Sequence, residues 1–225
     1  MTQGNHIQIK VCGLMRPDQA AAAADAGVDY IGLVFFPPSP RSVTGLLAAD
    51  IAAAVPSDVR KVALAVDPSD ALVDEIAELD LDILQLHGKE CPERVRQLGL
   101  RTGLKTMKAI GVRESGDLDM IQDYVGAADR LLIDAKPPEG ATRPGGNALA
   151  FDWRLVAGRD MLLPWMLAGG LTPENVKKAI QQTGARQLDV SSGVERSPGD
   201  KDTALISAFV AAARGLPSRA PSALA

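Results

Sequence analysis

The sequence predicts an α/β fold in the form of a single (β/α)8 TIM barrel. Short apolar, strand-like segments alternate with helix-like segments along nearly the whole chain, and there are eight strand candidates. Two candidates near the C-terminus run directly into Gly and Ser residues, as the last two strands of many phosphate-binding barrels do. The chain has 225 residues, 46% of them apolar, and a barrel of about 250 residues is typical of this class.

The predicted strands are bounded by Gly, Pro and polar residues. They are Ile7–Val11, Tyr30–Phe35, Lys61–Val66, Ile83–Leu86, Leu104–Ala109, Leu131–Ile133, Pro164–Ala168 and Gln187–Val190. Their alternation with helices favours a closed parallel sheet over an α+β arrangement.

The predicted helices lie between these strands. They include Pro17–Ala26, Leu46–Val55, Ala71–Leu79, Glu93–Leu98, Asp117–Val125 and Pro173–Gln182, with a last helix over Thr203–Ala213. Thr172 is suited to cap the helix that Pro173 begins, because its hydroxyl accepts from a free helical N–H and proline fits the first position. Gly27 and Gly184 are suited to end helices.

Two connections are longer than the others, Phe36–Gly45 and Ala135–Ala150, and both are rich in Pro and Gly. Loops of this length in a compact domain are often functional. No segment has the composition of a domain linker, so we expect one barrel domain over residues 1–215. Residues 216–225, rich in Pro, Ser and Ala, are expected to form a disordered tail.

The composition excludes several classes of protein. The net charge is −4 without a basic block, so we expect no nucleic-acid partner. There is no apolar run long enough to cross a bilayer, and Met1–His6 does not resemble a signal peptide, so we expect no membrane association and a cytoplasmic location. Two cysteines are too few for a disulfide framework, and with two histidines they leave little material for a metal site.

The segments Leu167–Leu171 and Asp189–Glu195 predict a phosphate site. In each, an apolar strand is followed by small residues that expose backbone N–H groups to an anion, next to a helix N-terminus. The expected donors are Gly169, Gly170, Ser191, Ser192 and Gly193. Asp189 is expected to orient the second loop from within its strand. One Gly pair alone indicates only a tight turn, but two successive junctions match the paired loops after strands 7 and 8 of a barrel.

Cys12 is a candidate for chemistry at the barrel mouth. Side chains alternate along a strand, so Ile9 and Val11 would face the helices, whereas Lys10 and Cys12 would face the interior. Cys12 would then lie at the C-terminal end of its strand, where barrel active sites are found. A free cysteine is also commonly a small buried hydrophobe, and both interpretations stay open on these residues alone. Lys10 is expected to fill the interior within a polar network rather than act as a nucleophile.

Asp134 closes the sixth strand candidate and opens the long loop after it. The same alternation turns Leu132 and Asp134 inward. A carboxylate at the mouth is a candidate acid or base, and the alternative is an aspartate that caps a loop. The catalytic interpretation is favoured because Asp134 would share the mouth with Cys12.

Two further residues are candidates for substrate contact. Arg41 follows Ser39 and Pro40 in the loop after the second strand, and a rigid loop can aim a guanidinium at a carboxylate, although a solvated surface arginine is the alternative. His87 ends the fourth strand candidate and would share an inward face with Gln85, either as a ligand contact or as a satisfied polar residue. Cys91 opens the next helix, and a structural role is expected for it.

The ordered set of motifs resembles the phosphoribosylanthranilate isomerases of tryptophan biosynthesis, from about Ile7 to Ala213. The residues that carry the resemblance are Lys10-Val11-Cys12-Gly13-Leu14, Gly32-Leu33-Val34-Phe35, Ser39-Pro40-Arg41-Ser42-Val43, Gln85-Leu86-His87-Gly88, Leu132-Ile133-Asp134-Ala135-Lys136, Gly145-Gly146-Asn147, Phe151-Asp152-Trp153, Leu167-Ala168-Gly169-Gly170-Leu171 and Asp189-Val190-Ser191-Ser192-Gly193-Val194-Glu195. Single pieces are weak, whereas the ordered set is specific. Met15 stands where a small hydroxyl residue is usual, and Asn147-Ala148 where another Gly is common.

The resemblance implies a reaction and roles for these residues. The reaction is an Amadori rearrangement of N-(5-phosphoribosyl)anthranilate to 1-(2-carboxyphenylamino)-1-deoxyribulose 5-phosphate, without metal or cofactor. Asp134 would act as general acid on the ring oxygen, Cys12 as thiolate general base on the proton of the second sugar carbon, and Arg41 as the holder of the anthranilate carboxylate. The implied partner is the small-molecule substrate alone, with the protein a monomer or a homodimer.

Two alternatives are considered, a second phosphosugar isomerase and a protein of a different class. One is an aminoaldose isomerase of histidine biosynthesis, but those barrels use paired aspartates, and the first strand here offers Cys12. The other is a catalytically silent phosphosugar-binding barrel, which would need neither Cys12 nor Asp134.

Overall fold

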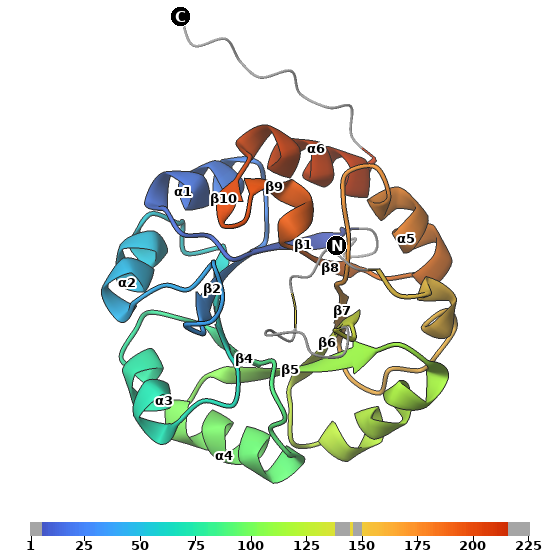
Figure 1. Cartoon of the computed structure of the whole chain (residues 1–225), viewed down its shortest axis with the longest axis horizontal. Helices are drawn as coiled ribbons and strands as arrows, with labels where there is room; N and C mark the ends of the chain where they lie inside the picture. Colours follow the sequence, from blue (N-terminus) through green and yellow to red (C-terminus); the bar gives the residue numbers. More distant parts are fainter. Residues whose placement is uncertain (1–5, 138–144, 146–149, 216–225) are drawn as a thin grey trace, which may run out of the picture.

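The computed structural model of the chain describes residues 6–137, 145 and 150–215. Within them, parallel strands close into a barrel in the order β1-β2-β3-β4-β5-β6-β7-β8, and β8 pairs with β1. Helices form a ring around the strands (Figure 1). The predicted fold class, a single (β/α)8 barrel, is confirmed. The tail predicted over residues 216–225 lies outside the described residues.

The strands lie where the sequence predicts them, with small shifts at their ends. They are β1 (Gln8–Cys12), β2 (Tyr30–Phe35), β3 (Arg60–Ala65), β4 (Ile83–Leu86), β5 (Lys105–Val112), β6 (Arg130–Ala135), β7 (Trp165–Leu167) and β8 (Gln187–Val190). The largest difference is at β5, which continues past the predicted end at Ala109. Its additional residues pair with β6 as far as Val112 opposite Ala135, so partner strands rather than local pattern determine this end.

The α-helices are also close to prediction. They are α1 (Pro17–Asp25), α2 (Gly45–Ala53), α3 (Asp70–Ala77), α4 (Pro92–Thr102), α5 (Val176–Thr183) and α6 (Thr203–Arg214). Helix α5 begins later than the predicted Pro173. Asn175 explains the delay, because its side chain accepts from the Thr172 amide and donates to the Gly170 carbonyl, which stabilises a turn before the helix.

The α-helix predicted over Asp117–Val125 is wrong in type. This segment is a 3-10 helix, η1 (Ser115–Tyr124). Asp117 accepts hydrogen bonds from the amides of Arg113 and Glu114 at the start of the segment. Gly116 and the aspartates are weak α-helix formers, so the segment forms the tighter 3-10 helix instead of an α-helix. A second 3-10 helix, η2 (Trp153–Leu155), precedes β7.

A small hairpin after β8 has no counterpart in the predicted elements. The chain passes through a short 3-10 helix, η3 (Ser192–Val194), into β9 (Glu195–Ser197), and β10 (Asp200–Lys201) returns antiparallel to it. The hairpin lies over the barrel next to α1 and α6 (Figure 1). Strands this short have no recognisable alternation in sequence. The hairpin brings Glu195 and Lys201 to the barrel mouth.

The core has two layers that follow strand alternation. Ile9 and Val11 of β1 belong to the large cluster between strands and helices, as predicted. The barrel interior holds a separate apolar cluster: Tyr30, Val62, Ile83, Met107, Ala109, Leu132, Met166 and Ala168. Each fully buried aliphatic side chain stabilises the fold by about 1.5–3 kcal/mol, so these layers form a rigid base for the mouth.

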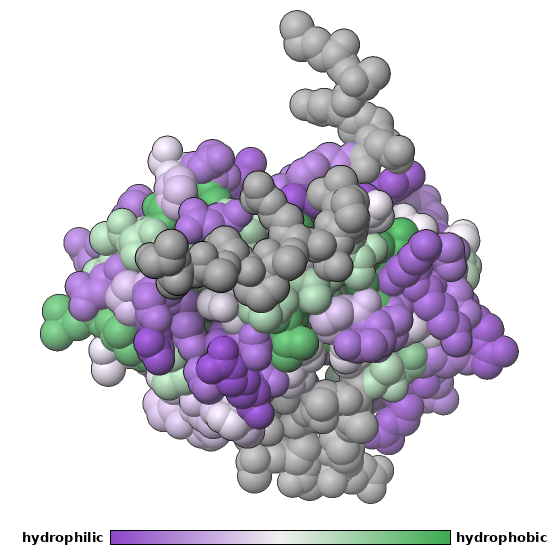
Figure 2. Space-filling view, turned by 90° about the horizontal axis from the view of Figure 1, so that it is seen from above, coloured by the Kyte–Doolittle hydropathy of each residue, from purple (hydrophilic) through white to green (hydrophobic). Residues whose placement is uncertain are grey.

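One face of the molecule is largely hydrophilic. On the face in Figure 2, hydrophilic residues cover most of the described surface, and apolar residues form small separate groups. The described large apolar side chains that are exposed include Leu46 on α2, Leu100 on α4 and Leu162 before β7. No helix among the described residues has the length and hydropathy needed to cross a membrane.

Candidate active site

One cavity opens at the carboxyl end of the strands. Its volume is about 490 Å³, including the part open to solvent. Its lining comes from several strand ends and loops: Cys12, Val34, Phe36, Ser39, Arg41, Leu64, Val66, His87, Asp134, Gly145, Asp189 and Ser191. Four predicted site residues, Cys12, Arg41, His87 and Asp134, are therefore brought together, although the chain separates them widely.

Cys12 is the last residue of β1 and faces the interior, as predicted. Its side chain is buried, with 5% of the residue exposed, and it packs with Val34 and Leu64. Burial raises the pKa of the Cys12 thiol above its ordinary value, while the nearby ammonium groups of Lys10 and Lys201 act in the opposite direction. The thiol thus lies in an apolar pocket flanked by buried positive charge.

Asp134 lies near the end of β6 and also faces the cavity. Its Oδ1 accepts a hydrogen bond of 2.8 Å from the Ala135 amide, and its Oδ2 lies 3.3 Å from Nε2 of His87. Gly145 closes this corner, since a Cβ there would lie 2.9 Å from Asp134 Oδ2 and 3.0 Å from His87 Nε2. The carboxyl group is therefore held by its own backbone and by an imidazole.

His87 follows β4 and reaches the cavity beside Gln85. The Gln85 Nε2 lies 3.2 Å from His87 Nδ1, and the His87 amide donates to the Ala65 carbonyl of β3. These contacts orient the ring so that Nε2 faces Asp134. The predicted inward face shared by Gln85 and His87 is confirmed.

Arg41 is buried, unlike the solvated arginine considered as its alternative. The Ser39 hydroxyl accepts from the Arg41 amide, which shapes the loop after β2. The guanidinium donates from Nε and Nη2 to the two carboxylate oxygens of Glu195, each at 2.7 Å. Gly13 has a positive φ and lies against this arginine, because a Cβ there would be 2.5 Å from Arg41 Cδ. The Glu195 carboxylate thus already occupies one edge of the Arg41 guanidinium.

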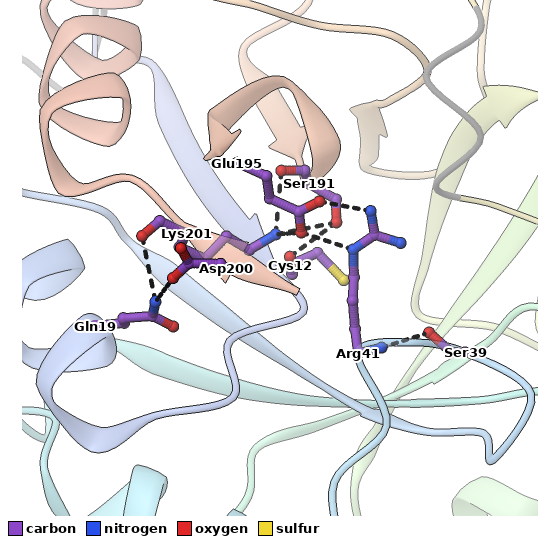
Figure 3. A network of polar contacts seen from close by, with 8 residues as sticks. All are labelled: Cys12, Gln19, Ser39, Arg41, Ser191, Glu195, Asp200 and Lys201. Atoms are coloured by element: carbon purple, nitrogen blue, oxygen red, sulfur yellow. Dashed lines mark hydrogen bonds and ion pairs between the residues drawn. The ribbon is translucent and has the colours of Figure 1, made fainter. Parts of the chain in front are cut away.

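Glu195 and Lys201, from the unpredicted hairpin, connect these parts (Figure 3). Lys201 Nζ donates to Glu195 Oε1 at 2.6 Å and to the Ser191 carbonyl and hydroxyl oxygens, and the Ser191 hydroxyl donates to the Cys12 carbonyl. Burial alone would raise the pKa of Glu195, but the contacts with Arg41 and Lys201 lower it below its ordinary value. Burial lowers the pKa of Lys201, and the charge of Glu195 opposes this.

Neither Glu195 nor Lys201 was among the predicted site residues. Glu195 ends one of the quoted motifs, so its position there was a usable signal. Lys201 offered none, because nothing local marks a lysine that will be enclosed by a hairpin.

The two predicted phosphate loops come together. A Cβ on Gly193 would overlap the carbonyl oxygen of Leu171, so the second loop packs directly on the first. Gly169 and Gly170 have φ values of +85° and +63°, which favour glycine. The amides of Gly169, Gly170, Ser192 and Gly193 donate to no other described residue. Free amides around paired loops are suited to bind a phosphate.

The predicted phosphate residues differ in where they lie. Asp189 and Ser191 line the cavity, whereas the other four lie in the loops outside its lining. Asp189 was expected to orient the Ser191 loop, but its described partner is Lys10, whose Nζ donates to its Oδ1 at 2.8 Å. Lys201 holds the loop instead. The expected polar role of Lys10 inside the barrel is confirmed.

The described residues contain no group of three or more His, Cys, Asp or Glu side chains placed to hold a metal ion. Cys91 is an exposed residue at the N-cap of α4, and it is not among the residues that line the cavity.

Comparison with known proteins gives one consistent result. A family model described as N-(5'phosphoribosyl)anthranilate (PRA) isomerase matches residues 9–212. An N-(5'-phosphoribosyl)anthranilate isomerase of Paracoccus denitrificans is 57% identical over 208 residues, which is 92% of this chain and 97% of that protein. One of Paramagnetospirillum magneticum is 53% identical over 210 residues, covering 93% and 98% of the two chains.

Solved structures give the same result. Phosphoribosyl anthranilate isomerase of Thermotoga maritima has a TM-score of 0.83 at 34% identity, covering 93% of this chain and 100% of that one. A phosphoribosyl anthranilate isomerase in complex with reduced 1-(o-carboxyphenylamino)-1-deoxyribulose 5-phosphate has a TM-score of 0.81 at 32% identity, with the same coverage.

Proposed function

Because this chain belongs to the N-(5'-phosphoribosyl)anthranilate isomerase family, we propose that it performs that reaction with Cys12 as general base and Asp134 as general acid. The chain is an isomerase of the aldose–ketose type. Its substrate is N-(5-phosphoribosyl)anthranilate, and its product is 1-(2-carboxyphenylamino)-1-deoxyribulose 5-phosphate.

A single observation supports the two catalytic assignments above all others. Cys12 from β1 and Asp134 from β6 line the same cavity, although these strands are not neighbours in the barrel. A sugar bound between them would have a proton acceptor on one side and a carboxyl group on the other. An acid and a base held in such positions each contribute about 10²–10⁴-fold to the rate.

The proposed steps follow from these positions. Asp134 donates a proton to the furanose ring oxygen, and the ring opens to a protonated Schiff base between the first sugar carbon and the anthranilate nitrogen. The Cys12 thiolate then removes the proton from the second sugar carbon and becomes a thiol, giving an enolamine. The enolamine is converted to the ketoamine when the first carbon gains a proton and the hydroxyl group on the second carbon loses one.

His87 and Arg41 are proposed to contact the substrate. The His87 ring lies 3.3 Å from Asp134 Oδ2, so it orients the acid and can contact the sugar next to it. Arg41 lines the cavity, and Glu195 accepts from its Nε and Nη2. The remaining donors of Arg41 are available to the anthranilate carboxylate.

The paired loops would hold the phosphate. The proposed donors are Gly169, Gly170, Ser191, Ser192 and Gly193, whose small side chains let the anion approach the backbone. Asp189 does not fit a direct phosphate contact, because a carboxylate repels the anion, and its place next to Lys10 supports a different role.

We also propose a cytoplasmic location, a monomer or a homodimer, and no nucleic-acid partner. The hydrophilic face seen in Figure 2 and the net charge of −4 support the cytoplasmic location. The relative from Thermotoga maritima is described as dimeric.

The decisive experiment measures turnover of freshly prepared phosphoribosylanthranilate by the purified protein, with EDTA present and with direct identification of the product. Formation of the ketoamine is expected, and it would establish the reaction and its independence from free metal together. A folded protein that binds a product analogue without converting the substrate would instead be a silent phosphosugar-binding barrel. Conversion of a histidine-pathway aminoaldose would identify a different substrate.

A further inference from the structure

Lys10 lies inside the barrel beside the proposed base. It precedes Cys12 by two residues on β1, so both side chains face the interior. Its side chain is completely buried, and its Nζ donates to Asp189 Oδ1 on the adjacent strand, where Lys10 and Asp189 are direct partners in register. The ammonium is thus held at one place by a carboxylate.

Gly32 allows Lys10 and Cys12 to approach each other. Gly32 is the register partner of Cys12 on β2, and a Cβ added there would lie 2.9 Å from Cys12 Sγ and 3.0 Å from Lys10 Nζ. The thiol and the ammonium therefore converge on the space that a side chain at this position would fill. A Cβ at this position would require the thiol or the ammonium to shift.

A buried ammonium needs more than one partner. Lysine has three N–H donors, and the described hydrogen bonds of Lys10 Nζ account for one of them, to Asp189. A buried charge that is incompletely paired is costly, so a second negative group next to it is favoured. A thiolate on Cys12 would be such a group.

We propose that Lys10 is a positioning residue for this isomerase, whose ammonium stabilises the Cys12 thiolate while Asp189 holds the ammonium in place. This inference rests on the proposed function, in which Cys12 is the base. Lys10 keeps its proton throughout the reaction. Cys12 enters as the thiolate and leaves the deprotonation step as the thiol.

The charges around the thiol support this assignment. Burial alone would lower the pKa of Lys10, but Asp189 and Cys12 together raise it above the ordinary value, so Lys10 stays charged. Burial raises the pKa of Cys12, and among the opposing influences the charge of Lys10 is the largest.

Other charged groups also face the thiol. Lys201 from β10 lowers the pKa of Cys12, and Asp189 raises it. Arg41 from the loop after β2 is close enough to interact with the thiol, and His87 and Asp134 lie on the lining of the same cavity. These groups stay in place in all variants below except where one is changed.

The chain allows a direct titration of this thiol. It has two cysteines, so Cys91→Ser leaves Cys12 as the sole thiol, and serine is well suited to the N-cap position that Cys91 occupies. In this background, thiolate formation is followed by absorbance at 240 nm and by the pH dependence of alkylation with iodoacetamide. The same protein with Cys12→Ala supplies the baseline.

Three variants give different expected midpoints. Lys10→Met should raise the thiol midpoint by about one pH unit or more, because an opposite charge at this range is lost. Asp189→Asn should lower the midpoint, because it removes a negative charge and releases the ammonium to the thiolate. Lys10→Arg should restore a midpoint near that of the parent. At pH values below the thiol midpoint, kcat/KM of Lys10→Met should be lower than that of the parent by about tenfold for each pH unit by which the midpoint has risen.

The opposite directions distinguish this role from a structural one, because damage to the barrel would alter both variants in the same direction. Lys61→Met is the matched control, since this buried lysine contacts Asp80 rather than the cavity, and its midpoint should not change. An unchanged midpoint in Lys10→Met would overturn the proposal. If Lys10→Met does not fold, an unchanged or raised midpoint in Asp189→Asn overturns it.

A different result would contradict the proposed function. Turnover retained by Cys12→Ala would remove Cys12 as base, whatever the titration shows. An inactive Cys12→Ala together with unchanged midpoints would overturn the role of Lys10 alone.

Discussion

Arg41 and Glu195 form a buried two-pronged ion pair across the barrel mouth, although they are 154 residues apart in the chain. Both hydrogen bonds are 2.7 Å long. Only 5% of the Arg41 side chain and 4% of the Glu195 side chain are exposed. The pair joins the loop after β2 to the hairpin after β8. It therefore fixes the direction in which the guanidinium faces the cavity.

Arg41→Lys should weaken substrate binding. An ammonium cannot reproduce the fork, and a hydrogen bond to a charged group is worth about 1.5–3 kcal/mol, which corresponds to a rise in KM of roughly 10- to 150-fold. Steady-state kinetics with phosphoribosylanthranilate checks this. A substrate analogue without the anthranilate carboxylate should show no such difference between variant and parent. An unchanged KM for the natural substrate would reject the assigned role of Arg41.

Glu195→Gln should destabilise the protein at neutral pH by about 3–5 kcal/mol, because it leaves Arg41 and Lys201 as buried charges without their carboxylate. The free energy of unfolding in urea measures this loss. Glu93→Gln is the control, since the exposed pair between Glu93 and Arg96 should contribute less than about 1 kcal/mol.

The effect of Glu195 should also depend on pH. Its pKa is lowered in the folded state, so its stabilising contribution is complete above the unfolded value of about 4.3 and is lost as the pH falls through the folded value. The difference in the free energy of unfolding between the parent and Glu195→Gln should therefore be constant above about pH 5 and should become smaller in more acidic solution. A difference that stays constant down to the acid transition would show that the carboxylate charge is not the cause.

Cys12→Ala and Asp134→Asn should each reduce turnover by at least about 10²–10⁴-fold, because each removes one of the two proposed proton-transfer groups. Affinity for the reduced product, measured by calorimetry, should stay close to that of the parent, since the phosphate loops are not altered. Cys91→Ala, at the exposed cysteine, should keep full turnover. Loss of binding in both catalytic variants would indicate that these residues hold the ligand rather than transfer protons.

Gly193→Ala should disrupt the proposed phosphate site. The added methyl group would overlap the Leu171 carbonyl, which is backbone and cannot rotate away, so the two loops must separate. We expect a loss of about 1–3 kcal/mol in stability and a raised KM. Gly116→Ala is the matched control, because a Cβ there meets nothing within 4 Å. Equal effects of the two substitutions would mean that close packing of the loops has no special importance.

Much of the fold could be predicted because its determinants are local. Apolar runs marked every strand, and a proline at a helix start, such as Pro17, marked a helix. Strand alternation placed Cys12, Asp134 and His87 on the inner face, where the structure has them. The differences arose where another segment decides the outcome, as at the end of β5, which extends because β6 is there to pair with it.

The sequence by itself determined the barrel, the two glycine- and serine-containing loops proposed to bind phosphate, and the residues available for chemistry at the strand ends, since strand and helix periodicity are properties of short segments. Only the tertiary structure decided which charges meet. Lys10 could have been paired with several acids, and its partner Asp189 follows from barrel closure between β1 and β8. Likewise, Glu195 and Lys201 reach Arg41 and Ser191 through a hairpin too short to leave a pattern. Electrostatic pairing depends on distance in space, which a linear pattern does not contain.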